Sequence, residues 1–415
     1  MPTGITPREV VWTLNKTTLY RYRSPEGRPS AGPPVLFVYA LINRPYILDL
    51  RPGNSFVAHL LEGGHDVFLL DWGRFGWEDR EVTLDELVDV HLPRAVARMQ
   101  RAAGREDYTL FGYCMGGTMA LAHAAMRPRG LAALVALTTP VDFRHAGMHR
   151  AWTDARHLDA AAVAEGLGNI PGTLIGLGNK MMRPTANFVD VHDAYAELVM
   201  AGRDLTSWRA MNQWVNDGVP FPGAAFVQWV RDLYQQNRLF EGTWEVAGEP
   251  IDLSAITAPV LTIAAGKDHI VPPAMARPLN DLVGSPDTTY LELPAGHVGV
   301  LAGSGARERR WPAVTDSLAT RAACPSPFPR CRRGDPIHDK DHTTRCPSSP
   351  STAPASPSTG SRSARAPRSP SRSARTRSRP SPGSPAMTTP RTWTTRGPMP
   401  PCSRGGWRTG CSPPA

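Results

Sequence analysis

Residues 112–117, with the sequence Gly-Tyr-Cys-Met-Gly-Gly, constrain the fold most strongly, because they set a nucleophile between glycines. The preceding residues 108–111 are typical of a strand, and residues 118–126 are typical of a helix. Glycines at this spacing permit a sharp turn and a close approach of strand to helix. A thiolate on Cys114 would lie at the N-terminus of that helix, where the dipole favours negative charge. The alternative is a buried, unreactive cysteine.

Apolar runs of strand length alternate with segments of helical periodicity through most of the chain. A short hairpin is predicted at residues 9–24, and residues 87–102 and 306–320 are typical of helices. Strands are predicted at residues 35–39, 66–71, 108–113, 131–137, 259–265 and 289–293. This alternation favours a mostly parallel α/β sheet. A nucleophile on a sharp strand-to-helix turn of such a sheet is the nucleophile elbow of the α/β-hydrolase fold.

The pattern changes between residues 145 and 248, where the sequence is helical and interrupted by prolines. This segment is also rich in tryptophan, with Trp152, Trp208, Trp214, Trp229 and Trp244. Because it separates two predicted strands of the sheet, we interpret it as a helical cap over the edge where the nucleophile lies. The catalytic domain is therefore predicted over residues 1–320, with the cap inserted at about 145–248.

The formal net charge of +9 belongs to the C-terminal part of the chain. Residues 321–415 contain 17 of the 46 lysines and arginines but only 3 of the 37 acidic residues, so the preceding part has a net charge of −5. A nucleic-acid partner is therefore not expected for the catalytic domain. The C-terminal part is rich in proline, serine and arginine and poor in large aliphatic residues. Such a composition cannot offset the entropy of ordering, which predicts disorder.

Two interpretations of residues 321–415 stay open. Arginine- and serine-rich runs, at 361–365 and 371–375, resemble disordered arms that bind polyanions. A shifted reading frame in GC-rich DNA would produce a similar composition, with stray tryptophan and cysteine. We favour the frame error, because the composition changes abruptly after residue 320 and lysine is almost absent among the basic residues there.

Cys114 is the only cysteine before residue 321, so this part of the chain cannot form an internal disulfide, which suits a reducing cytoplasm. The other five cysteines match no zinc-binding spacing. The N-terminal residues lack the basic and apolar segments of a signal peptide. No stretch reaches roughly 18 apolar residues, so we expect no membrane span.

A cysteine nucleophile needs a base and a group that orients the base, and the sequence supplies both in the order typical of α/β-hydrolases. Asp268 follows the predicted strand at 259–265, at the sheet edge where active sites form. His297 follows the last predicted strand, at 289–293. We therefore predict a Cys114–His297–Asp268 triad, in which the imidazole moves the proton and the carboxylate holds its tautomer.

Two further assignments accompany the triad. His269 is a weaker candidate for the base, because adjacent loop residues seldom point to the same place and His269 neighbours Asp268. The oxyanion hole needs two backbone N–H groups. One is predicted at Met115, directly after the nucleophile. The other is predicted at Leu41, with Ala40 as the next choice, in the loop after the strand at 35–39.

Beyond the elbow, several segments resemble polyhydroxyalkanoate synthases, and most closely their short class III type. The most specific of them is the long run at residues 38–50, which general esterases lack. The matching segments are residues 38–50, 70–73, 112–117, 139–143, 168–172, 268–273 and 296–299. The resemblance covers about residues 5–320.

The resemblance implies polymerisation of (R)-3-hydroxyacyl-CoA on a cysteine, with release of CoA. Cys114 would be the acylated nucleophile and His297 the base. Asp268 would orient His297 or help to activate the 3-hydroxyl group. The implied partners are the acyl-CoA, the growing polyester chain, a second synthase subunit and a second copy of the chain, at the surface of polyester granules in the cytoplasm. No metal or cofactor is implied, because the CoA thioester is itself the substrate.

Two alternative functions stay open at this point. A thioesterase or ester hydrolase could use the same triad and would release free hydroxy acid. A binding protein that acts through its arginine- and serine-rich tail would need no triad at all.

Overall fold

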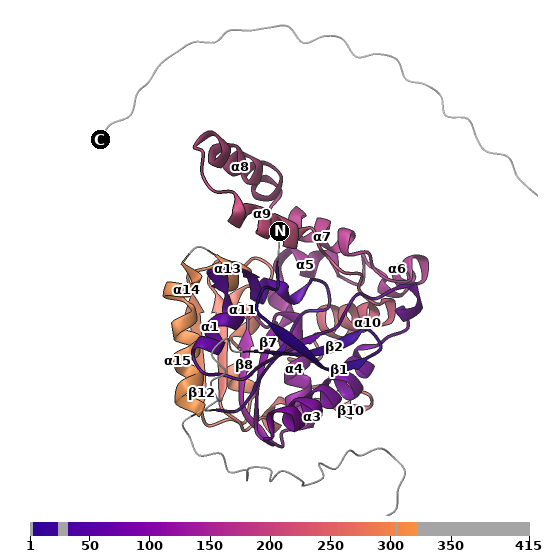
Figure 1. Cartoon of the computed structure of the whole chain (residues 1–415). Helices are drawn as coiled ribbons and strands as arrows, with labels where there is room; N and C mark the ends of the chain where they lie inside the picture. Colours follow the sequence, from indigo (N-terminus) through magenta and orange to yellow (C-terminus); the bar gives the residue numbers. More distant parts are fainter. Residues whose placement is uncertain (1–2, 24–31, 304, 323–415) are drawn as a thin grey trace, which may run out of the picture. The chain divides into compact units, whose positions relative to one another are not determined.

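The computed structural model of the chain describes residues 3–23, 32–303 and 305–322. The tail interpretations above concern residues that lie outside this range, except that residues 321 and 322 still belong to helix α15 (Trp311–Ala322). The described residues form an eight-stranded sheet with helices packed against it (Figure 1).

Six parallel strands form the main part of the sheet, and an antiparallel hairpin extends one edge. In their order across the sheet the strands are β1 (Arg8–Leu14), β2 (Thr17–Tyr22), β6 (Val67–Asp71), β3 (Val35–Val38), β7 (Tyr108–Tyr113), β8 (Leu131–Leu137), β11 (Val260–Ala265) and β12 (Thr288–Leu293). These elements confirm the predicted hairpin and strands, with ends that differ by a residue or two. Four of the parallel strands, β6, β3, β7 and β11, are buried along their full length, and β8 is buried except at Ala132, as expected where both faces are covered.

Helices on the two faces of the sheet pack against alternate side chains of the central strands. Helix α4 (Met115–Met126) packs on β7, where it meets Gly112. The neighbouring Phe111 points to the opposite face, because side chains alternate along a strand. There its ring lies 4.7 Å from Phe37 and 5.6 Å from Phe56, which in turn lies 5.4 Å from Trp311. Helices α1 (Phe56–Glu62) and α15 therefore cover the face opposite α4.

Three predicted helices have different bounds in the structure. The predicted helix at 118–126 begins three residues earlier, directly after Cys114. The helix predicted at 87–102 is irregular, with α2 (Leu84–Glu86), a π-helical turn η3 (Leu87–His91) and α3 (Leu92–Ala103). Pro93 lies in the first turn of α3, where a proline cannot donate the bond that would continue a regular helix.

The prediction of one final helix at 306–320 is wrong. The structure has α14 (Ala306–Arg309), and α15 starts only at Trp311. Pro312 is the second residue of α15, and a proline is accommodated in the first turn of a helix but not inside one. The segment therefore begins a new helix here.

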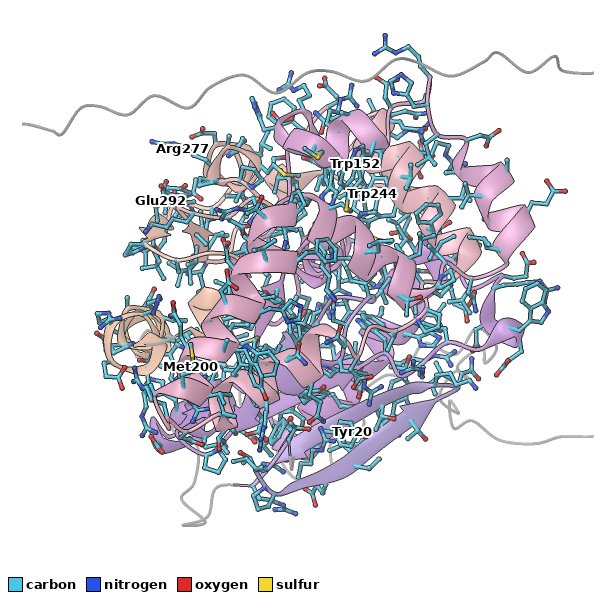
Figure 2. The ribbon with its side chains drawn as sticks, turned by 90° about the horizontal axis from the view of Figure 1, so that it is seen from above. Tyr20, Trp152, Met200, Trp244, Arg277 and Glu292 are labelled. Carbon is cyan, nitrogen blue, oxygen red and sulfur yellow. The ribbon has the colours of Figure 1, made fainter. Side chains whose placement is uncertain are left out.

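Between β8 and β11 the chain forms the helices of the predicted cap, seen from above in Figure 2 with Trp152 and Met200 on them. The cap elements are η4 (Phe143–His145), α5 (Gly147–Trp152), α6 (Ala160–Leu167), α7 (Gly172–Met181), η5 (Ala186–Asp190), α8 (Val191–Met200), α9 (Thr206–Val215), α10 (Gly223–Gln228) and η6 (Trp229–Gln235). A small hairpin of β9 (Glu245–Val246) and β10 (Glu249–Pro250) leads back to the sheet.

Shorter elements complete the described chain. They are η1 (Pro45–Leu48), β4 (Asp49–Arg51), β5 (Asn54–Ser55), η2 (Trp77–Asp79), η7 (Leu253–Ala255), α11 (Pro273–Ala276), α12 (Leu279–Leu282) and α13 (Gly299–Ala302). Among the described residues, no helix has both the length and the apolar character needed to cross a membrane.

Candidate active site

Cys114 lies at the apex of the turn between β7 and α4, with φ 54° and ψ −126°. Few non-glycine residues adopt a positive φ, and such strain is retained where the surrounding structure enforces it. Here the Cys114 N–H donates to the Leu137 carbonyl at 2.9 Å, and the Cys114 carbonyl accepts from the Gly117 N–H at 2.9 Å. The predicted nucleophile elbow is therefore present, and its backbone is held from both sides.

Close approaches of the backbone explain two glycines of the elbow. A Cβ atom on Gly112 would lie 2.3 Å from the Cα atom of Gly117, so β7 and α4 can cross here only without side chains. A Cβ atom on Gly116 would lie 2.2 Å from the Val38 carbonyl oxygen and 2.6 Å from the carbonyl carbon of Tyr39. Gly116 thus allows the elbow to touch the end of β3, which leads into the predicted oxyanion loop.

We expect Gly116→Ala to destabilise the chain by about 1–3 kcal/mol, because the new Cβ atom meets backbone atoms that cannot rotate away. Thermal or denaturant unfolding would measure the loss. Gly166→Ala is the matched control, since nothing lies within 4 Å of its Cβ position in α6. That change should stabilise the helix by about 0.5–1 kcal/mol. Equal stabilities for the two variants would contradict the packing argument.

Asp268 and His297 come together as the sequence predicted. His297 Nδ1 lies 2.6 Å from Asp268 Oδ2, and both side chains are buried. The other carboxylate oxygen, Asp268 Oδ1, accepts from the N–H groups of Ile270 at 2.8 Å and Val271 at 2.9 Å. These bonds fix the carboxylate, which in turn fixes the orientation of the imidazole.

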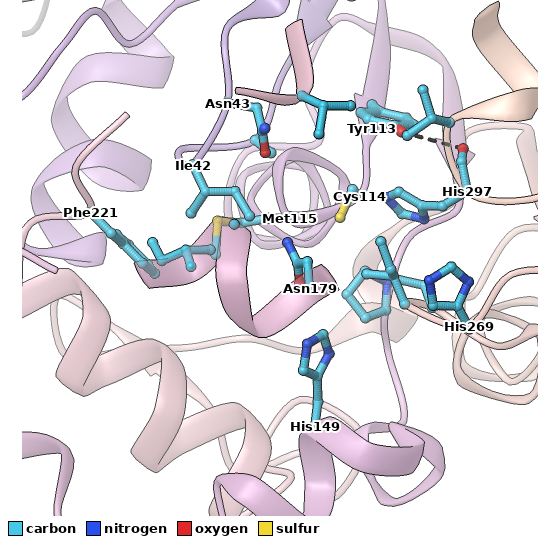
Figure 3. A pocket seen from close by; sticks show the side chains of 18 of the residues that line it. Ile42, Asn43, Tyr113, Cys114, Met115, His149, Asn179, Phe221, His269 and His297 are labelled. Carbon is cyan, nitrogen blue, oxygen red and sulfur yellow. Dashed lines mark hydrogen bonds between the residues drawn. The ribbon is translucent and has the colours of Figure 1, made fainter. Parts of the chain in front are cut away.

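The electrostatic environment of His297 favours its charged form. Burial alone would lower the pKa of His297, but the charges of Asp268 and Cys114, and hydrogen bonds to both, raise it to about 10. Figure 3 shows the Cys114 sulfur beside the His297 ring. The geometry thus brings Cys114, His297 and Asp268 into one chain of interacting groups.

His269 makes no such pair, although it lines the same pocket. Its Nδ1 is buried without a hydrogen-bond partner among the described residues, and burial lowers the pKa of its imidazole.

Sequence reasoning missed a further contact of His297. Tyr113, within the elbow motif, packs its ring 5.3 Å from the His297 imidazole and donates its hydroxyl to the His297 carbonyl at 3.3 Å. In the sequence, the position of this tyrosine directly before the nucleophile was the signal that could have indicated the contact.

The predicted oxyanion donors occupy the expected loop and helix start. Met115 and Ala40 line the pocket, together with Ile42. The Leu41 side chain is instead buried in the core. The assignment of the Leu41 and Met115 backbone N–H groups stays a prediction.

The triad opens into a cavity of about 480 Å³ that lies between the sheet edge and the cap. Sheet loops contribute Cys114, His297 and their neighbours, and the cap contributes the opposite wall (Figure 3). The cap side chains include His149, Thr153, Ile175, Asn179, Lys180, Asn187, Trp214, Phe221, Phe226, Trp229, Val230 and Tyr234. Most of this wall is apolar, so the cavity suits an acyl chain. In the described part of the chain, no group of three or more His, Cys, Asp and Glu side chains could hold a metal ion.

Known proteins provide an independent comparison. The α/β hydrolase fold family matches residues 33–304. The poly(3-hydroxyalkanoate) polymerase subunit PhaC of Allochromatium vinosum is 36% identical over 321 residues, which cover 77% of this chain and 90% of that protein. The chain belongs to the PhaC family. The resemblance inferred from the sequence, and the α/β-hydrolase fold, are thereby confirmed.

A further PhaC protein and a solved structure extend the comparison. PhaC of Haloferax mediterranei is 37% identical over 320 residues, but the chain spans only 65% of its length. A solved structure assigned as a lipase from Sulfolobus solfataricus has a TM-score of 0.50 at 14% identity, and covers 74% of this chain and 90% of that one. The second likeness shows the shared fold alone. The PhaC relatives thus match about three quarters of this chain.

Proposed function

We propose that this chain polymerises (R)-3-hydroxyacyl-CoA into polyhydroxyalkanoate with release of CoA, through an acyl thioester on Cys114. Membership of the PhaC family carries the proposal, and the bond between His297 and Asp268 beside Cys114 supplies the chemistry. The reaction needs no cofactor in this proposal, because the thioester is already activated.

Acylation uses the proton that His297 holds. The Cys114 thiolate attacks the thioester carbonyl of the acyl-CoA, and the bond from that carbonyl to the CoA sulfur breaks. The leaving CoA thiolate takes the proton from the His297 imidazolium. A neutral imidazole and an acylated Cys114 remain, and the oxyanion is stabilised meanwhile by backbone N–H groups at the elbow.

Chain extension uses the same histidine in the opposite direction. Acylation removes the Cys114 charge, which is one of the causes that raise the pKa of His297. The imidazole is then a better proton acceptor for a hydroxyl group that attacks the acyl carbonyl. An ester bond forms, the bond from carbonyl to Cys114 sulfur breaks, and His297 becomes protonated again. Asp268 stabilises the imidazolium at both ends of the cycle.

The cap favours transfer to a hydroxyl group over hydrolysis, because it encloses the acyl group in a mostly apolar cavity. Helices α5, α7 and η6 supply much of this wall. A hydrolase on the same fold remains the second candidate, since an open triad would transfer the acyl group to water.

A second synthase subunit, or a second copy of the chain, is proposed to cover the outer face of the cap. Leu174, Leu177 and Met181 share one face of α7, and each is nearly half exposed. Other exposed apolar side chains of the cap are Phe188, Val189, Val199 and Met200. Large exposed apolar areas are typical of interaction sites. The same face is compatible with a position at the surface of a polyester granule.

We expect the purified chain to convert 3-hydroxybutyryl-CoA into CoA and polyester, with one monomer unit incorporated into the polyester for each CoA released. Chromatography would measure CoA and free 3-hydroxybutyrate, and turbidity with acid digestion would measure the polymer. Free hydroxy acid in the amount of the CoA released would identify a hydrolase instead. The assay should be run both without and with an added second synthase subunit, because the proposal includes such a partner.

A further inference from the structure

The cap presents several polar side chains to the cavity, and most of them have partners within the cap. Lys180 Nζ donates to Asn216 Oδ1 at 2.9 Å, and Asn187 Nδ2 donates to the Lys180 carbonyl at 3.0 Å. Thr153 Oγ1 donates to the His149 carbonyl at 2.7 Å. Each of these groups is thus tied by a hydrogen bond to a neighbouring group of the cap.

Asn179 differs from these groups. It lies on the pocket-lining face of α7, beside Ile175 and Gly176, and its side chain lies next to the imidazole of His149. An amide can donate two hydrogen bonds and accept two more, so most of its capacity is unused. Figure 3 shows the Asn179 amide pointing into the cavity toward Cys114 and Met115.

His149 is fixed in place beneath this amide. Its ring lies edge-on to Trp152 and to Tyr234, each at 6.0 Å between centroids. Its Nδ1 is buried without a hydrogen-bond partner among the described residues, and the Asn179 amide lies beside the ring (Figure 3). Burial, together with the charges of His269 and His297, lowers the pKa of His149, and the ring is neutral near pH 7. A fixed, neutral ring beside the Asn179 amide can donate one hydrogen bond and accept one, and can therefore orient that amide.

We propose that Asn179 hydrogen-bonds the 3-hydroxyl group of the bound acyl chain, and that His149 is the positioning residue that orients the Asn179 amide. The inference rests on the proposed function, and it assigns to the cap the recognition of the 3-hydroxyacyl class.

The chemistry of the acyl chain supports this assignment. Its thioester carbonyl must lie at Cys114, close to the backbone donors of the elbow. The next polar atom is the hydroxyl oxygen, two carbon atoms farther along, and much of the surrounding wall is apolar, including Ile42, Phe221 and Phe226. A hydroxyl group buried there without a partner would be unfavourable. Asn179 is a polar group of the cap with free capacity for it.

Release of CoA from 3-hydroxybutyryl-CoA and from butyryl-CoA, each in a single turnover, tests the proposal. In Asn179→Leu, which keeps the side-chain size, the second-order rate constant of CoA release from the hydroxylated substrate should fall about tenfold, as for the loss of one hydrogen bond. The value for butyryl-CoA should change less than about twofold. Because each variant is compared with itself on two substrates, a general loss of folded protein cancels.

Further variants separate positioning from packing. His149→Phe keeps the ring between Trp152 and Tyr234 but cannot bond to Asn179, so it should lose part of the preference for the hydroxylated substrate. His149→Gln can keep that bond and should retain the preference. Asn187→Leu, the matched control, should change both substrates by the same factor. If Asn179→Leu does not fold, Asn179→Ser should show the same selective loss.

Two results would overturn the inference, and they are distinguishable. An unchanged ratio between the two substrates in the Asn179 variants, with normal turnover in the wild type, would overturn the role of Asn179 alone. No CoA release by the wild-type chain from either substrate, with or without a partner subunit, would overturn the proposed function and the inference with it.

Discussion

Cys114→Ala is expected to abolish CoA release from 3-hydroxybutyryl-CoA, with a fall in kcat of about four orders of magnitude or more. The substitution removes the sulfur that forms the acyl thioester, and no other cysteine lies among the described residues. Alanine keeps the Cβ atom, so the strained backbone at φ 54° has the same cost as before. The melting temperature should therefore change little. Chromatography of released CoA gives the rate.

Cys114→Ser distinguishes a thioester from other acyl adducts. Wild-type protein stopped during turnover should carry an acyl group on Cys114 that neutral hydroxylamine removes, because thioesters react with it readily. An adduct on the serine variant would be an oxygen ester and would resist that treatment. Peptide mass spectrometry separates Cys114 from the cysteines after residue 322. Undiminished CoA release by Cys114→Ala would eliminate the proposed mechanism.

The triad could be predicted from the sequence because its members belong to short local patterns. Cys114 lies between glycines on a strand-to-helix turn, and Asp268 and His297 follow strands that a run of apolar residues marks clearly. The parallel sheet then brings the ends of those strands to one edge. The order of the three residues along the chain was therefore enough to predict that Asp268 and His297 lie within hydrogen-bond distance.

The wall of the pocket could not be predicted in this way. His149 and Asn179 come from different cap helices, 30 positions apart in the chain, and neither carries a motif. Their contact depends on how α5 and α7 pack, which periodicity does not determine. In α7 the apolar Leu174 and Leu177 are exposed, whereas the polar Asn179 faces the cavity. An apolar stripe that points outward indicates a surface for another molecule.

The helix boundaries also depend partly on local sequence signals and partly on tertiary contacts. Pro312 ended the predicted continuity of the last helix, a local signal that the periodicity argument overlooked. The π-helical turn at 87–91 precedes Pro93 and places His91 where its Nδ1 meets the Thr17 hydroxyl at 2.8 Å. That contact joins residues 74 positions apart, so no local pattern could have indicated it.

Asp268→Asn is expected to lower kcat by about three to four orders of magnitude while leaving Cys114 and the pocket in place. The amide cannot stabilise the imidazolium of His297, and it can hold the ring in the wrong tautomer. Its side-chain oxygen can still accept from the N–H groups of Ile270 and Val271, which preserves the loop. Asp252→Asn makes the same chemical change at the start of η7 and should leave kcat unchanged.

The same variant tests the charge on His297. In the wild type, the charges of Asp268 and Cys114 outweigh burial and raise the pKa of His297 to about 10, so the ring keeps its proton from pH 6.5 to pH 9. Removing the Asp268 charge takes away the largest of the causes that raise this pKa, and burial continues to lower it. The imidazole should therefore lose its proton at a lower pH, which NMR of labelled histidine would measure. An unchanged titration with a large fall in kcat would mean that Asp268 acts on the substrate hydroxyl group instead of on His297.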